Sequence, residues 1–188
     1  MLRLKFETSE IENLEQGYLR QSAGIGDSEQ ADKRAKDAGA RIRQGYRTKE
    51  NLYLIFYWKH QSSRFRERLI NAFNSNSCDT VTAILNQVHE IVEVLDDAGC
   101  AVTELVGLKG VGVPTASAFL ANIYPEKFTL IDILALRALG IDNQEIAFYR
   151  YYNDECRRLA KESSTSMRTL DRALWQWGKT NPPRRTGR

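Results

Sequence analysis

A short glycine-rich segment and the aspartate that follows it carry most of the chemical information in this chain. The segment is Leu108-Lys109-Gly110-Val111-Gly112, and Asp132 stands 20 residues after its last glycine. Gly110 and Gly112 allow positive φ and let another backbone approach closely. We expect a helix on each side, with the amides at the start of the second helix pointing outward at the positive end of its dipole. Such a surface binds an oxyanion, of which a nucleic-acid phosphate is the obvious one.

Apolar side chains recur at helical spacing along the chain, so we expect helices to position the glycine turn and Asp132. The clearest helix spans 79–95, with Asp79 expected as its N-cap and Gly99 as its C-terminal stop. Weaker patterns of the same kind predict three further helices, over 29–46, 64–74 and 167–177.

The aromatic run 52–58 is ambiguous, since its length and composition fit a buried strand as well as a helix. We predict a helix, because Thr48 can cap it and nothing nearby offers a hairpin partner. Together the predicted helices indicate an all-α fold. We expect one domain of eight to ten helices over 1–188, either a single compact body or two lobes that share one cleft, with a basic flexible tail at 180–188.

Composition and charge restrict the class of protein. Of the 188 residues, 42% are hydrophobic, 27% are charged and only 4 are proline, which excludes a disordered or low-complexity chain. The net charge of +3 is uneven, because 1–70, 71–145 and 146–188 carry +4, −7 and +6. Both basic ends fit a polyanion partner, and solvated helix faces with a frayed tail are the alternative. One basic cluster comprises Lys59, Arg64, Arg66 and Arg68.

The sequence gives little support for a membrane protein, a disulfide-stabilised protein or a metal-binding protein. No apolar run approaches the roughly 20 residues that cross a bilayer, so we expect a cytoplasmic monomer without membrane contact. Cys78, Cys100 and Cys156 are too widely spaced for a disulfide framework or a metal knuckle, and we expect three buried thiols. His60 and His89 lie too far apart for a local ligand pair, and we expect surface roles for both.

The pattern around the glycine turn resembles the helix-hairpin-helix motif, over 104–124. The resemblance extends to the helix-hairpin-helix-GPD superfamily of DNA glycosylases, in which a Gly/Pro-rich loop and a catalytic aspartate follow the hairpin. Lys109 replaces the proline usual in that hairpin, and Asp132 falls at the position of the aspartate. The match covers about a fifth of the chain, and a hairpin plus an aspartate at the family distance is fairly specific. The resemblance implies double-stranded DNA as the partner and DNA contacts at Leu108, Lys109, Gly110, Val111, Gly112, Thr115 and Arg137.

Two departures from the family pattern narrow the expected activity. Members that also cleave the strand carry a lysine two residues after the last glycine of the hairpin, where this chain has Pro114. No Schiff base with the sugar can form at that position. The four-cysteine iron–sulfur loop is also missing, since only Cys156 follows Asp132. The resemblance therefore implies a monofunctional glycosylase without lyase activity, metal or cofactor.

Asp132 is the expected catalytic residue. Breaking the bond between base and deoxyribose creates positive charge on the sugar, which a carboxylate stabilises while it orients or deprotonates a water. A purely N-capping role is the alternative, and the two roles are compatible because a cap fixes the direction of the carboxylate. The flipped base also needs a pocket. Candidates for that pocket are Tyr57, Trp58 and Lys59, whose aromatic members fit the core as well, and Tyr149, Tyr151 and Tyr152.

Three functions remain open at this point. The leading one is a monofunctional glycosylase that removes a damaged, mismatched or modified base flipped out of duplex DNA. The second is a non-catalytic helix-hairpin-helix protein that holds DNA without turnover. The third is a hairpin that serves protein interaction only, which predicts no salt-sensitive DNA binding.

Overall fold

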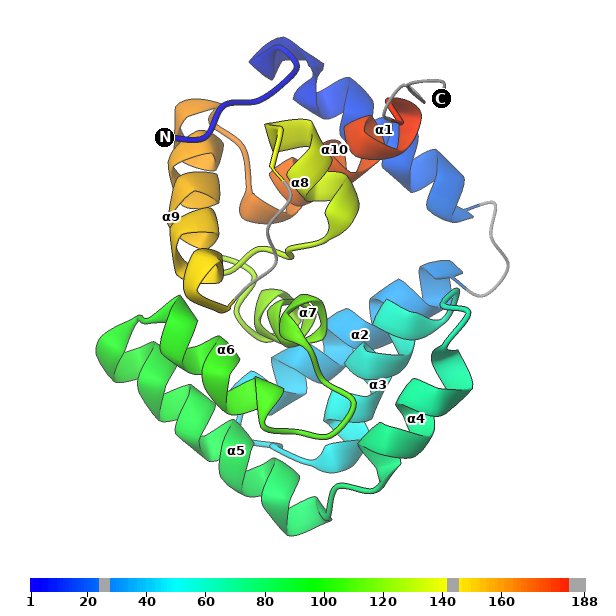
Figure 1. The fold of residues 1–188 in the computed structure, drawn as a ribbon, viewed down its shortest axis with the longest axis vertical. Coiled ribbons are helices and arrows are strands. Elements are labelled where there is room, and N and C mark those ends of the chain that lie inside the picture. Colours follow the sequence, from blue (N-terminus) through cyan, green and yellow to red (C-terminus); the bar gives the residue numbers. More distant parts are fainter. Residues whose placement is uncertain (24–27, 142–145, 183–188) are drawn as a thin grey trace, which may run out of the picture.

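The structure is a computed structural model that describes residues 1–23, 28–141 and 146–182 (Figure 1). Within these residues the chain forms ten α-helices and no strand, which confirms the predicted all-α fold. The expected basic tail falls outside the described residues from 183 onward. The elements are η1 (Thr8–Glu10), α1 (Ile11–Ala23), α2 (Ser28–Arg43), α3 (Lys49–His60), α4 (Arg66–Asn74), α5 (Cys78–Glu90), η2 (Ile91–Leu95), α6 (Ala98–Val106), α7 (Val113–Ile123), α8 (Ile133–Leu139), α9 (Ile146–Glu162) and α10 (Met167–Thr180).

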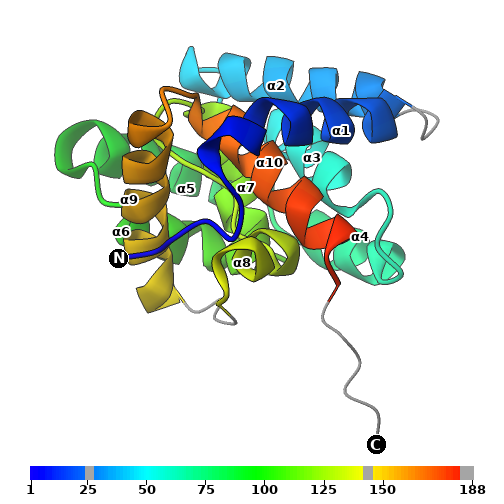
Figure 2. The same cartoon turned by 90° about the horizontal axis from the view of Figure 1, so that it is seen from above.

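The helices form two lobes around a continuous hydrophobic core. In the first lobe, α2 to α7, helix α7 lies at the centre and packs against α2, α3 and α6 (Figure 1). In the second lobe, α1 and α8 to α10, helix α10 crosses between α1 and α8 (Figure 2). Buried side chains of both lobes belong to one apolar cluster. The segment 124–132 passes from α7 to α8, so it carries the chain from the first lobe to the second and ends at Asp132.

The ambiguous aromatic run is helical, as predicted. It forms α3 (Lys49–His60), and Oγ1 of Thr48 accepts a hydrogen bond from the amide of Asn51 at 3.3 Å. Its apolar side chains turn inward, with Leu52, Ile55 and Phe56 buried. Helix α3 therefore packs into the core of the first lobe, and its last turn holds Lys59 and His60.

The predicted helix over 79–95 is present, but its N-cap is Ser77 and not Asp79. Oγ of Ser77 accepts a hydrogen bond from the amide of Thr80 at 3.0 Å, so α5 begins one residue before Asp79. Asp79 lies in the first turn, where its charge still favours the positive end of the helix dipole.

The expected stop at Gly99 is also wrong. The helix changes into the π-helical turn η2 and ends at Asp96, which adopts a left-handed conformation with φ of 47°. Asp97 then caps α6, and its Oδ1 accepts from the amide of Gly99 at 2.8 Å. Gly99 therefore lies inside the next helix, because the aspartate before it supplies the cap.

Several cysteine and histidine predictions need correction. Cys78 and Cys100 lie exposed in the first turns of α5 and α6, and only Cys156 is buried. His60 and His89 are partly buried and hydrogen-bonded, to Thr115 and Tyr124 respectively. In the described part of the chain, no group of three His, Cys, Asp or Glu side chains could hold a metal ion. Nor is any helix among the described residues long and apolar enough to cross a bilayer.

Candidate functional site

The glycine turn joins α6 to α7 over residues 107–112. Gly110 has φ of +81°, a conformation that L side chains rarely adopt. A Cβ at this position would lie 3.0 Å from both the carbonyl oxygen of Leu69 and the amide nitrogen of Phe73 in α4. Glycine is therefore required both by the backbone angle and by the close approach of α4.

Asn76 fastens the turn to the end of α4. Its Oδ1 accepts a hydrogen bond from the amide of Lys109 at 2.9 Å, and its Nδ2 donates to the carbonyl of Lys109 at 3.1 Å. The Lys109 amide is thus occupied and offers nothing to an anion. The amides of Gly110 and Gly112 bond to no other described residue, and the side chain of Lys109 is exposed. The two glycine amides and the ammonium of Lys109 are therefore the groups of the turn that could bind an anion.

The other expected contacts of the hairpin turn inward. Leu108, Val111 and Thr115 are buried, so their side chains shape the turn and do not face a ligand. Arg137 donates from Nη1 to the carbonyl of Gly178 at 2.8 Å, which fastens α8 to α10. Of the residues expected to contact DNA, Lys109 and Gly112 are the exposed ones.

Buried tyrosines hold the segment that leads to Asp132. Tyr149 donates to the carbonyl of Thr129 at 2.8 Å, and Tyr152 donates to that of Leu130 at 2.8 Å. Burial raises the pKa of both phenols well above the ordinary value, so they remain neutral donors. They are not part of a base pocket, contrary to expectation. Two amides of the segment are held by side chains as well, that of Thr129 by Asn153 at 3.0 Å and that of Ile131 by Ser117 at 3.1 Å.

Asp132 uses its two carboxylate oxygens differently. Oδ1 accepts hydrogen bonds from the amides of Leu134 at 2.9 Å and Ala135 at 3.0 Å, which confirms the predicted N-cap of α8. Oδ2 lies 3.7 Å from Nζ of Lys59, and 20% of the Asp132 side chain is exposed. The cap therefore fixes the carboxylate, one oxygen of which faces the ammonium of Lys59, and part of the side chain remains exposed.

The partners of Asp132 come from distant parts of the chain and form what we call the junction cluster: Lys59, Asp132 and Asp171. Lys59 stands in the last turn of α3, and 16% of its side chain is exposed. Asp171 lies in α10, where burial raises the pKa of its carboxyl to about 6, with Arg168 opposing and Asp132 reinforcing the shift. Arg168 pairs with Asp171 at 3.1 Å and with Asp32 of α2 at 3.0 Å. Charged groups of both lobes therefore meet at this junction.

The three expected pocket residues have different surroundings. Lys59 is beside Asp132, as described. Trp58 is partly buried against Leu130, and the guanidinium of Arg168 lies 5.1 Å from its ring centroid, so it belongs to the same junction. Tyr57 instead faces Tyr53 of its own helix, with ring centroids 6.3 Å apart. Two of the three thus lie at the junction.

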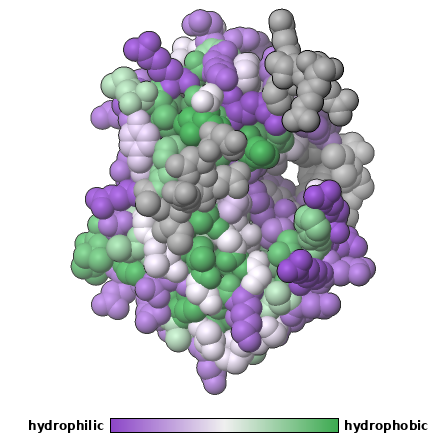
Figure 3. Space-filling view, in the orientation of Figure 1, coloured by the Kyte–Doolittle hydropathy of each residue, from purple (hydrophilic) through white to green (hydrophobic). Residues whose placement is uncertain are grey.

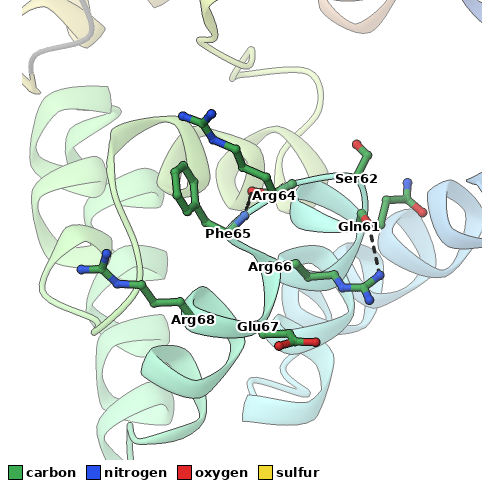
Figure 4. Close-up of a pocket in the computed structure, with 8 residues that line it drawn as sticks. Gln61, Ser62, Arg64, Phe65, Arg66, Glu67 and Arg68 are labelled. Atoms are coloured by element: carbon green, nitrogen blue, oxygen red, sulfur yellow. Dashed lines mark hydrogen bonds between the residues drawn. The ribbon is translucent and has the colours of Figure 1, made fainter.

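A basic cavity follows directly after α3. It has a volume of about 650 Å³ and is lined by residues 61–68 (Figure 4). Arg64 and Arg68 lie on the same side as the ring of Phe65, and the guanidinium of Arg64 is 4.6 Å from its centroid. Phe65 is 51% exposed. The sequence indicated these arginines by charge but not that they surround a cavity.

The hairpin, the basic cavity and the junction cluster lie close together. Helix α4, which continues from the cavity, contacts Gly110 of the turn. His60, next to Lys59, bonds to Thr115 in the first turn of α7 at 2.9 Å. On the side of α4 the surface shows hydrophilic residues around a small apolar patch (Figure 3). The basic cavity is thus linked to the hairpin through α4, and the hairpin to the last turn of α3, which carries Lys59 of the junction cluster.

Comparison of the chain with protein-family models, with curated proteins and with solved structures found no match in any of the three. The chemistry of the site's own residues therefore carries the functional assignment.

Proposed function

We propose that the protein is a DNA glycosylase that hydrolyses the N-glycosidic bond of a damaged, mismatched or modified base flipped out of duplex DNA. The observation that carries the proposal is the carboxylate of Asp132. Two amides fix its Oδ1, its Oδ2 lies 3.7 Å from Nζ of Lys59, and 20% of the side chain is exposed. A fixed carboxylate that is open to a ligand is what stabilisation of a developing cation requires.

The pair of Asp132 and Lys59 matches the charges of this reaction. As the bond to the base lengthens, the sugar becomes positive and the departing base becomes negative. Asp132 stabilises the sugar and orients a water, and the ammonium of Lys59 stabilises the base. Lys59 lies in the last turn of α3 and Asp132 is the N-cap of α8, so regular helices hold both groups and little reorganisation is needed when charge develops.

The hairpin and the basic cavity supply the contacts that hold DNA in this proposal. The exposed Lys109 and the free amides of Gly110 and Gly112 bind one backbone phosphate. The arginines around the cavity, Arg64 and Arg68 among them, bind others. These contacts are independent of base sequence and set the strand in register with Asp132.

The test is a panel of duplexes that each carry one altered base: uracil, an alkylated purine, an oxidised purine, adenine in a mismatch or a modified cytosine. Each is incubated with the protein and then with hot alkali, which breaks the strand wherever a base has been lost. We expect breaks on at least one duplex. Salt-sensitive binding without breaks would favour the non-catalytic binding protein. Absence of salt-sensitive binding would contradict both functions.

A further inference from the structure

We infer a second binding site: the cavity lined by residues 61–68 takes one unpaired nucleotide, whose base stacks on Phe65 and whose phosphate pairs with Arg64 and Arg68. The nucleotide belongs to a single-stranded segment that adjoins a duplex on the hairpin. The inference rests on the proposed function only for that duplex, because Asp132 is not among the residues that line the cavity.

Phe65 presents a large apolar surface to solvent. Its side chain is 51% exposed, whereas Phe56 of α3 and Phe73 of α4, the two helices that flank it, are completely buried. In the described part of the chain Phe65 stacks on no other aromatic ring, and the guanidinium of Arg64 lies 4.6 Å from its centroid. Stacking on an aromatic side chain tolerates every base, because every base has a π face. The ring is therefore available to a base of any sequence.

Two arginines beside this ring have no acidic partner. Among the described residues, neither Arg64 nor Arg68 forms an ion pair or a side-chain hydrogen bond, and both side chains are exposed. Arg66 differs, since its Nη1 donates to the carbonyl of Gln61 at 3.3 Å. Glu67, the one acidic residue that lines the cavity, points with Arg66 away from the ring (Figure 4). The positive charge beside the ring is thus left for a ligand, and one guanidinium can donate two hydrogen bonds to a phosphate.

The size of the cavity favours one nucleotide over a duplex. Its volume of about 650 Å³ lies within the roughly 300–1,000 Å³ of small-molecule sites. A base inside a duplex has both faces covered by its neighbours, so it cannot lie on the ring of Phe65. An unpaired base has a free face, and aromatic rings flanked by cations are what binds single strands without regard to sequence. The cavity therefore fits an unpaired nucleotide.

The cavity lies next to the turn that holds the duplex in the proposed function. Arg68 precedes Leu69, whose carbonyl oxygen would lie 3.0 Å from a Cβ at Gly110. The last residue of the cavity thus adjoins the close contact between α4 and the hairpin. A strand bound by the exposed Lys109 can continue along α4 toward the cavity. We therefore expect the preferred DNA to carry a single strand beside a duplex.

The test compares a blunt duplex with the same duplex carrying a short single-stranded overhang, at its 3′ end in one DNA and at its 5′ end in another. The overhang contains 2-aminopurine, whose fluorescence falls when it stacks, and the duplex contains no damaged or mismatched base. We expect the full chain to bind at least one overhang DNA more tightly than the blunt duplex and to quench its fluorescence. Phe65→Ala should lose roughly tenfold or more of the affinity for that overhang DNA, restore the fluorescence and leave the affinity for the blunt duplex unchanged.

Two further variants serve as controls. Phe65→Tyr keeps a ring and should retain the preference for the overhang. Tyr46→Ala removes another exposed aromatic side chain, from the connection between α2 and α3, and should behave as the unaltered protein. Equal affinity of the unaltered protein for blunt and overhang DNA would overturn the inference, as would an equal loss on both DNAs in a folded Phe65→Ala protein. Binding of free deoxyadenosine monophosphate that depends on Phe65, without any preference for the overhang, would also overturn it, because the cavity would then serve a free nucleotide.

Failure of this site is separable from failure of the proposed function. Base loss on the duplex panel together with equal affinity for blunt and overhang DNA would remove the single-strand site and leave the glycosylase. A preference for the overhang that depends on Phe65, without base loss on any duplex, would leave the site and remove the glycosylase.

Discussion

Replacement of Asp132 separates the two functions of its carboxylate. Asparagine keeps an oxygen that can cap α8, whereas alanine keeps neither the cap nor the charge. Asn and Asp are nearly equivalent N-caps, so Asp132→Asn should change the free energy of unfolding by only a few tenths of a kcal/mol. Asp132→Ala removes the acceptor for the amides of Leu134 and Ala135 and should cost about 1 kcal/mol.

The effect on catalysis should be much larger and equal in both variants. A carboxylate about 4 Å from the developing charge, at an effective dielectric constant near 20, contributes about 4 kcal/mol. That corresponds to roughly a thousandfold in rate. Both substitutions remove this charge, so both should slow base loss by about that factor.

The assay is single-turnover base loss on whichever duplex shows alkali-dependent breaks, with the free energy of unfolding measured by urea for each variant. We expect two equally slow enzymes, of which only the alanine variant is less stable. An Asp132→Asn protein within about tenfold of the original rate, a loss below about 1.4 kcal/mol, would remove the carboxylate charge from the mechanism. Equal destabilisation in both variants would instead show that the charge, and not the cap, stabilises the fold.

Three further predictions concern the hairpin and the buried carboxyl. Lys109→Glu should weaken binding similarly on all duplex sequences and flatten the dependence of affinity on salt, measured by fluorescence anisotropy; an unchanged affinity would exclude the hairpin as a DNA contact. Asn76→Ala removes the two hydrogen bonds to Lys109 and should lower the free energy of unfolding by about 1–3 kcal/mol in urea, and a smaller loss would mean that the turn holds itself. Asp171 has its pKa raised from 3.8 to about 6, so between these pH values the folded state keeps a proton that the unfolded state releases. Its contribution to stability is therefore complete below pH 3.8 and lost as pH rises to about 6, and Asp171→Asn should abolish that part of the pH dependence; an unchanged profile from urea unfolding would contradict the shift.

The helices were predictable where local signals agree. Thr48 before the aromatic run gives the start of α3, because a side-chain cap and a helical first turn lie within four residues. The start of α5 was misplaced because Ser77 and Asp79 are both good caps two residues apart, and spacing alone does not choose between them. Boundaries therefore fail where two local solutions are nearly equal in energy.

Only the part of the candidate site that lies near Asp132 in the sequence was predictable. Asp132 precedes an apolar helix at a recognisable distance from the glycine turn, so its cap and its candidacy follow from nearby residues. Lys59 and Asp171 stand 73 residues before and 39 residues after it, and no local pattern links them. Packing does so instead: a Cβ at Gly178 would lie 2.0 Å from the carbonyl oxygen of Leu134, so glycine lets α10 press against α8. That contact between α8 and α10 brings the buried carboxyl of Asp171 near Asp132.

The charges at the junction are poorly explained by stability alone. A partly exposed ion pair such as that of Lys59 with Asp132 contributes about 0–1 kcal/mol. Burial raises the pKa of the Asp171 carboxyl to about 6, and the negative charge of Asp132 adds to that rise. Two acidic groups beside one lysine therefore add little to the stability of the fold, whereas the proposed base excision, which passes through a cationic sugar, would use the carboxylate of Asp132. Urea unfolding and single-turnover base loss of Asp132→Asn decide whether the charge of Asp132 serves stability or catalysis. If it serves catalysis, the variant should be as stable as the original protein, or more stable, and should have lost most of its rate of base loss.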